Sequence, residues 1–125
     1  MTQIIQRQKL DASGWPEGKP ELFIDLRSER LNPDGAIVDQ DGNLWNAQWG
    51  ASRIACYASD GKYKKSIEFP AKHMSCPAFG GSDLSQLFAT SAIFGMSKPS
   101  NDDGKTFVVK TPFKGLAENQ IRLEA

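Results

Sequence analysis

The chain has 125 residues, with 15 basic and 15 acidic side chains and a formal net charge of zero. This length predicts one domain with a substantial core, and the balanced charge excludes general attraction to phosphate backbones or anionic lipid. We therefore expect no nucleic-acid partner and no membrane partner. No uncharged run approaches the roughly 20 apolar residues of a membrane span. The N-terminus has no apolar signal core, so we expect a cytoplasmic location.

Alternation of apolar and polar residues predicts strands along the chain, and no segment has the period of a helix. Ile4–Leu10 is predicted as a strand, 11–18 as a long hairpin turn and 21–26 as the return strand. After a turn at 32–35, further strands are predicted at 36–38, Leu44–Trp49, 53–58, 63–69 and Thr106–Lys110. Asp41 and Gly42 suit the positive φ angles of a tight hairpin turn.

An internal repeat predicts how these strands are grouped. Leu-Trp-Asn-Ala at 44–47 recurs as Leu-Phe-Ala-Thr at 87–90, 43 residues later. Periods of about 40 to 50 residues with four strands each are typical of β-propeller blades. We therefore predict an all-β fold of antiparallel four-stranded β-propeller blades. The whole chain, 1–125, would form a single partial β-propeller domain, with an outer half-blade at 3–30, a full blade at 33–70 and a further blade at 73–125.

The two cysteines, Cys56 and Cys76, form no Cys-x-x-Cys motif and no cluster of zinc-ligand spacing. Free cysteine packs like a small hydrophobic residue, so we expect two buried free thiols. The alternatives are a disulfide and a nucleophilic thiol, for which His73 is the one candidate base.

A combination of motifs carries a family resemblance. Pro-Asp-Gly at 33–35 precedes a hairpin of the form Asp-x-x-Gly-x-Leu-Trp at 39–45, and Phe-Gly-Gly follows at 79–81. With residues 48–54, these motifs resemble the C-terminal half of the senescence-marker-protein/gluconolactonase family, which includes regucalcin and bacterial sugar lactonases. The resemblance runs from about residue 3 to residue 90. It implies about half of a six-bladed propeller.

The resemblance also implies a divalent metal (calcium, zinc, magnesium or manganese) at the mouth of the central channel. The family holds it with a glutamate, an asparagine and the aspartate of Pro-Asp-Gly, and only the aspartate has a match here, at Asp34. Asp34 is thereby implied as a metal ligand and as the catalytic base or water-orienting group. Carboxylate oxygen suits a hard cation, although Pro-Asp-Gly is also an ordinary turn tripeptide. We expect the metal site of this chain to be incomplete.

Three further residues are candidates for substrate binding. Trp49, beside Gly50, could stack on a sugar ring at the channel mouth or pack inside a blade. Ser75 holds the position in its blade that Asp34 holds in the preceding one, and no base is placed beside it. His73 precedes an inner strand, where it could shuttle a proton or be a solvated loop histidine.

Two classes of function follow. The chain could be part of a metal-dependent sugar-lactone hydrolase that requires a separate N-terminal half or a homodimer for activity. It could instead be a non-catalytic truncated propeller fragment that forms a homodimer, because two copies related by a two-fold axis would close a ring. A weak calcium-binding module is a third possibility.

Overall fold

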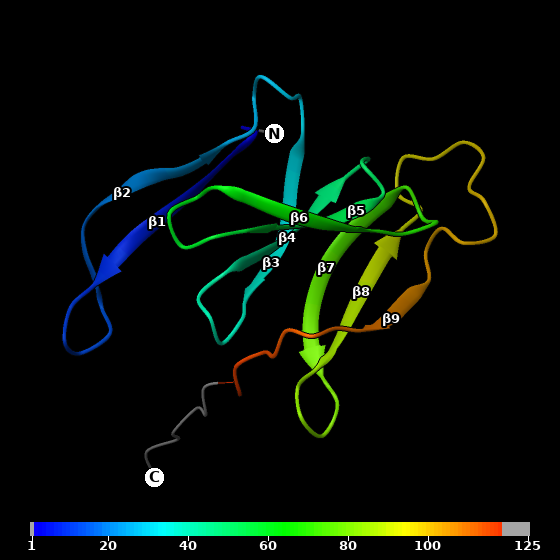
Figure 1. Cartoon of the computed structure of the whole chain (residues 1–125). Coiled ribbons are helices and arrows are strands. Elements are labelled where there is room, and N and C mark those ends of the chain that lie inside the picture. Colours follow the sequence, from blue (N-terminus) through cyan, green and yellow to red (C-terminus); the bar gives the residue numbers. More distant parts are fainter. Residues whose placement is uncertain (1, 119–125) are drawn as a thin grey trace, which may run out of the picture.

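The computed structural model describes residues 2–118, and this part of the chain contains nine strands and no helix (Figure 1). The strands are β1 (Ile4–Leu10), β2 (Pro16–Asp25), β3 (Asn32–Val38), β4 (Leu44–Trp49), β5 (Arg53–Tyr57), β6 (Tyr63–Glu68), β7 (His73–Gly80), β8 (Gln86–Ala92) and β9 (Thr106–Lys110). Every strand pair is antiparallel, which confirms the predicted all-β antiparallel class. A helix that could span a membrane is absent from residues 2–118.

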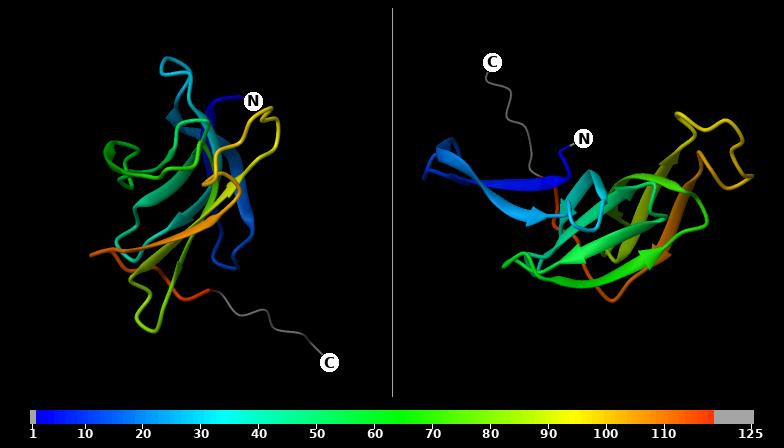
Figure 2. Two further views of the ribbon diagram at one scale, coloured as in Figure 1. Left: turned by 90° about the vertical axis from the view of Figure 1, so that its right-hand side faces the viewer. Right: turned by 90° about the horizontal axis from the view of Figure 1, so that it is seen from above.

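The strands fall into three groups. β1 and β2 form a separate hairpin, β3 to β6 pair in chain order, and β7 to β9 pair in chain order. The second and third groups are joined in one curved sheet by a single residue pair, Trp49 with His73. Figure 2 shows the hairpin extending from one side and the loop between β8 and β9 from the other. Only the second group has the four strands predicted for a blade, and the third has three within residues 2–118. The blade boundaries stay a prediction, and residues 119–125 of the last predicted blade lie outside the described residues.

The predicted hairpin turn at 11–18 is too long, because β2 begins at Pro16 and not at residue 21. Leu10 pairs with Pro16, so the strands continue almost to the turn. Asp11 closes that turn, since its Oδ1 accepts hydrogen bonds from the backbone N–H groups of Ser13 at 2.8 Å and Trp15 at 2.9 Å. These hydrogen bonds close a turn that is shorter than the predicted 11–18.

The predicted turn at 32–35 is wrong, because β3 begins at Asn32 and includes the Pro-Asp-Gly tripeptide. Asn32 pairs with Trp49 on β4, and the ladder then loses its register between Pro33 and Ala36. Proline has no N–H for the ladder, and a bulge accommodates this sequence within a strand. The strand therefore carries Asp34 at an irregular position.

The larger hydrophobic core surrounds Trp45, which is fully buried. Its ring contacts Phe79 edge-on, with centroids 6.1 Å apart, and Phe113 at 5.0 Å. These contacts join β4 to β7 and to the segment after β9. A second cluster, of Ile24, Leu26, Ala55 and Tyr57, attaches the β1–β2 hairpin to the rest of the fold.

Asp39 closes the hairpin between β3 and β4 from inside and is 1% exposed. Its carboxylate accepts hydrogen bonds from the indole N–H of Trp45 at 2.9 Å and from the Asn43 side-chain amide at 2.9 and 3.0 Å. The backbone N–H groups of Asp41 and Asn43 also donate to it. Burial opposes ionisation of Asp39, but these donors outweigh burial and lower its pKa.

We expect Asp39→Ala to lower the free energy of unfolding by about 3 kcal/mol. The substitution removes a charged acceptor and leaves the buried donors of Asn43 and Trp45 without a hydrogen-bond partner. The melting temperature should fall by roughly 10 °C, measured by circular dichroism at pH 7. Because the folded-state pKa is lowered, the carboxylate stabilises the fold above its ordinary pKa of about 4 and loses that effect as the pH falls below it. The exposed neighbour gives the control, Asp41→Ala, and equal melting of the two variants would contradict this role.

Candidate functional site

The four predicted site residues lie at one edge of the sheet; they are Asp34, Trp49, His73 and Ser75. Asn32 pairs with Trp49, Trp49 with His73, and His73 with Ala92, which makes one row across β3, β4, β7 and β8. In this row β3 and β7 begin while β4 and β8 end. Loops that follow the row therefore leave the sheet at the same edge.

Asp34 and Ser75 lie next to this row, two residues into β3 and β7 respectively. Their two strands approach closely at Gly35. A Cβ atom on Gly35 would lie 2.7 Å from the Ser75 carbonyl oxygen and 2.7 Å from the Cys76 Sγ. Only glycine permits such an approach, so Gly35 brings the Asp34 segment against the Ser75 segment. Asp34 and Ser75 each hold the third position of their strand, while an equivalent role for the two residues stays a prediction.

Asp34 has an exposed side chain, and no hydrogen bond or ion pair within residues 2–118 involves its carboxylate. Its backbone is held instead: the side-chain amide of Asn46 donates to the carbonyl oxygens of Asp34 at 3.0 Å and Gly35 at 3.2 Å. Asn46 is 1% exposed, and its Oδ1 is buried without a partner in the described part. Asn46 was not predicted. A polar residue between the buried Trp45 and Ala47 was the signal for it.

Trp49 and His73 form a stacked pair, with ring centroids 4.3 Å apart and planes inclined by 22°. Each ring covers one face of the other, and Trp49 is half-buried. The Nδ1 atom of His73 is buried and has no hydrogen-bond partner among the described residues. The Ser75 hydroxyl lies 2.8 Å from the Thr90 hydroxyl. Within residues 2–118 no base contacts it, so it has no group that would activate it as a nucleophile.

The metal expected at this edge would find one protein ligand of suitable chemistry. Asp34 offers an exposed carboxylate with no competing partner in residues 2–118, and such hard oxygen suits calcium or magnesium. The same residues contain no group of three or more His, Cys, Asp or Glu side chains able to hold a metal ion. Calcium takes about six to eight oxygens. The residues present therefore fit a metal only as one part of its ligand set.

Cys56 and Cys76 are both free, but only Cys56 is buried. The expectation that Cys76 is buried is wrong, because the register shifts between Met74 and Cys76 and the buried positions pass to Met74 and Pro77. Burial, with a smaller effect of the Asp39 charge, raises the pKa of the Cys56 thiol to about 11. Cys56 therefore stays protonated at neutral pH and is no nucleophile.

Comparisons with known proteins identify relatives along most of the chain. Residues 1–93 match a family model described as "SMP-30/Gluconolactonase/LRE-like region". The chain is 41% identical over 99 residues to an L-arabinolactonase of Azospirillum brasilense, covering 76% of this chain and 32% of that protein. It is 31% identical over 119 residues to a 6-deoxy-6-sulfogluconolactonase of Pseudomonas putida, covering 92% of this chain and 41% of that protein.

A solved structure is similar over almost the whole chain. It is a calcium-binding protein, regucalcin, from Agrobacterium tumefaciens, with a TM-score of 0.88 and 36% identity. The match covers 98% of this chain and 43% of that one. The chain thus spans less than half the length of each of these three relatives.

We expect Gly35→Ala to lower the free energy of unfolding by about 1–3 kcal/mol, because the added methyl group overlaps the β7 backbone. Denaturant melts measure this effect. The neighbouring Ala36→Ser, at an exposed position, should leave the free energy of unfolding unchanged, and a Gly35→Ala protein as stable as the parent would contradict the close approach.

Proposed function

The chain belongs to the SMP-30/gluconolactonase/LRE-like family, and on that basis we propose that it forms part of a metal-dependent sugar-lactone hydrolase. Two relatives that it matches over three quarters or more of its length are lactonases. The observation that carries the proposal is the exposed carboxylate of Asp34, which has no partner in residues 2–118 and lies at the same edge as Trp49, Ser75 and His73. This edge combines an oxygen ligand with groups that can bind a sugar.

In the proposed reaction, a divalent metal (calcium, zinc, magnesium or manganese) polarises the lactone carbonyl when bound. Asp34 would contribute one ligand oxygen to the metal. Its carboxylate would take the proton of the attacking water as the new C–O bond forms, and would return that proton to the ring oxygen as the lactone C–O bond breaks. Asn46 positions Asp34 through the two backbone carbonyls that it binds. Trp49 offers an apolar ring to the sugar, while Ser75 and His73 offer polar atoms to its hydroxyl groups.

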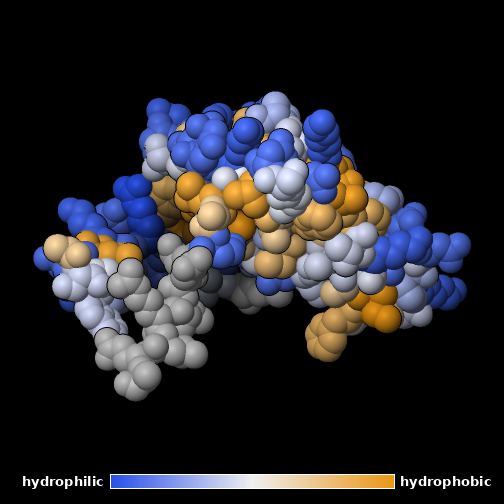
Figure 3. All heavy atoms as spheres, turned by 90° about the horizontal axis from the view of Figure 1, so that it is seen from below, coloured by the Kyte–Doolittle hydropathy of each residue, from blue (hydrophilic) through white to orange (hydrophobic). Residues whose placement is uncertain are grey.

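We place the remaining metal ligands outside this chain, on a separate N-terminal half or on a second copy in a homodimer. An uncovered face of the last strands supports this. Ala78, Phe88 and Val108 are directly paired across β7, β8 and β9, and Val108 is 54% exposed. Figure 3 shows apolar side chains at the surface across the middle of the molecule, between hydrophilic flanks. Apolar sheet faces of this kind mark contact surfaces.

The second candidate is a calcium-binding module without catalysis, including the non-catalytic propeller fragment that dimerises. The Agrobacterium tumefaciens relative is described as a calcium-binding protein. A single carboxylate predicts weak binding, which a second copy of Asp34 facing the first would strengthen. A lactone-hydrolysis assay separates the two candidates, because only the lactonase would hydrolyse the substrate.

We expect metal-dependent hydrolysis of arabinono- or gluconolactone by the chain as a homodimer or together with a separate N-terminal half. Asp34→Asn should lower kcat/KM by about 100-fold or more. The isosteric amide keeps the shape but can neither ionise nor take the proton. Rates are followed by pH-indicator absorbance with calcium, zinc, magnesium or manganese against a metal blank. Asp41→Asn, in the hairpin at the far end of β3, is the control. Equal rates for both variants would refute the catalytic role of Asp34, and no rate above the blank would refute hydrolysis by this chain without a further polypeptide.

Light scattering of the purified chain tests the partner. We expect a mass of two chains at micromolar concentration if a second copy covers the apolar face, and Val108→Lys should return the mass to one chain because it places a charge there. Ala12→Lys, at an exposed position in the turn between β1 and β2, is the control. A one-chain mass for the parent would exclude the homodimer and favour the separate N-terminal half.

A further inference from the structure

The outer edge of β9 pairs with no other strand within residues 2–118. We propose that this edge pairs with β9 of a second copy of the chain, in antiparallel orientation about a two-fold axis. The proposal goes beyond the proposed function, because such pairing needs neither a metal nor a lactone.

The two ends of the seven-stranded sheet differ in how they are protected. The sheet ends at β6 on one side and at β9 on the other (Figure 1). β6 carries the exposed Lys64 and Lys65, and the register of its ladder shifts beside Tyr57. Lysine and such irregularities discourage the addition of a further strand. β9 keeps one register over 106–110, and its middle three residues are apolar, so it is the edge that favours strand addition.

The backbone of β9 directs alternate residues to its free edge. The N–H of Ser91 donates to the carbonyl oxygen of Lys105 at 3.0 Å, and the N–H of Thr111 donates to that of Ser85 at 2.8 Å. The odd-numbered residues thus bond to β8, and bonded residues alternate along an antiparallel strand. The backbone N–H and C=O groups that face away from β8 are therefore those of residues 106, 108 and 110.

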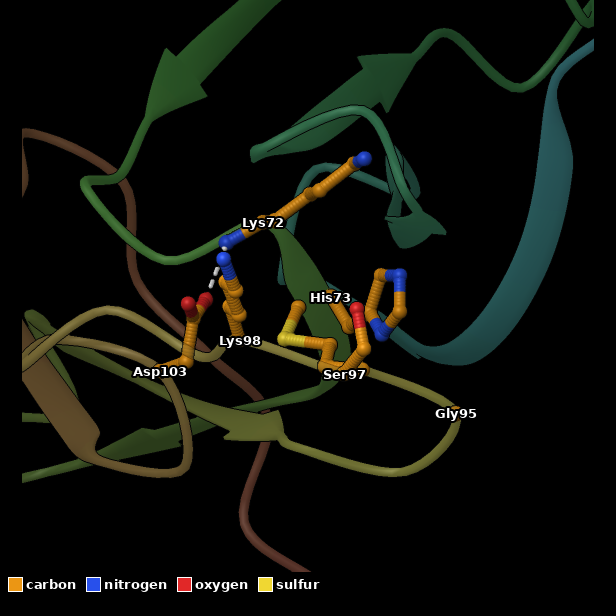
Figure 4. Close-up of a pocket in the computed structure, with 7 residues that line it drawn as sticks. Lys72, His73, Gly95, Ser97, Lys98 and Asp103 are labelled. Atoms are coloured by element: carbon orange, nitrogen blue, oxygen red, sulfur yellow. Dashed lines mark hydrogen bonds between the residues drawn. The ribbon is translucent and has the colours of Figure 1, made fainter.

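The residues just before β9 are held in place. Figure 4 shows Asp103 of the preceding loop beside Lys72, whose backbone N–H donates to its carboxylate at 2.8 Å. The backbone N–H of Ser100 also donates to Asp103, at 2.7 Å. Lys105 forms an ion pair with Asp102 at 3.0 Å, which balances a positive charge beside the strand. An edge that is already ordered loses little conformational freedom when a partner binds.

The sequence of β9 is complementary to itself when two copies are aligned antiparallel about Val108. Val108 then lies opposite Val108 of the second copy, and Phe107 lies opposite Val109. Phe107 and Val109 are only half-buried in one chain, and aromatic and β-branched residues stabilise paired strands when they lie opposite each other. Lys110 lies opposite Thr106, so no like charges are opposed. A register shifted by two residues would pair only 106–108 or 108–110 of each strand, which favours the centred alignment.

Pairing at β9 leaves the edge that carries Asp34 open. β8 separates β9 from β7, the strand that approaches Gly35. Each copy would therefore keep its own Asp34, and the lactonase proposal and the pairing of β9 can fail independently of each other.

Light scattering and amide hydrogen exchange of the full chain test the proposal without metal or substrate. We expect the mass to rise from one chain to two with concentration in the micromolar range. Exchange of the outward amides of residues 106, 108 and 110 should slow by about tenfold or more over the same range. The amides of residues 107 and 109, which already bond to β8, should be protected at every concentration.

Val108→Pro separates the edge from the apolar face beside it. The substitution removes the central outward N–H but keeps an apolar side chain, and proline is tolerated where the N–H of an edge strand is free. We expect a one-chain mass with little change in melting temperature. The control is Ala78→Lys, which places a charge on the same face two strands from the edge and should leave the mass at two chains.

Three results would overturn the proposal. The first is a one-chain mass at every concentration. The second is a two-chain mass with fast exchange at residues 106, 108 and 110, because another surface would then join the copies. The third is a folded Val108→Pro protein that keeps the two-chain mass, or a folded Ala78→Lys protein that loses it. If Val108→Pro does not fold, the exchange pattern of the parent chain decides. Hydrolysis by Asp34→Asn is measured separately, so neither result depends on the other.

Discussion

The close approach of β3 to β7 at Gly35 is the constraint on which the rest of the site depends. These strands share no ladder hydrogen bonds with each other, and their groups are paired only through Trp49 and His73. The sheet must therefore curve between the two groups, with Trp45 filling the space behind the curve. Because no side chain fits at Gly35, the first residues of both inner strands lie together at one edge. The candidate site is a consequence of that packing.

Two aspartates five residues apart illustrate how environment divides structural from functional roles. Asp39 is buried, and every one of its surrounding donors serves to close a hairpin around Trp45. Asp34 is exposed, and Asn46 holds its backbone while its carboxylate stays without a partner in residues 2–118. A carboxylate whose position is held through the main chain keeps its oxygens available for a metal or a water molecule. A carboxylate satisfied by protein donors does not.

The last three strands expose one face and cover the other. Leu87 and Ala89 on β8 are buried against the core, whereas the row through Phe88 and Val108 faces outward. An apolar sheet face of this kind is typical of contact surfaces.

Sequence alone determined the all-β class, the bounds of strands such as Ile4–Leu10 and Leu44–Trp49, and the family. These follow from alternation and turn chemistry, which act between residues close in the chain. The place of Asp34 inside a strand, the Asn46 amide on its backbone and the exposure of Cys76 were decided by tertiary structure. Each depends on register or on contact between strands: Gly35 meets Ser75 from the next group of strands, and His73 stacks on Trp49 across the junction. Local patterns carry no information on such distances, so sequence could nominate the site residues and only packing could assemble them.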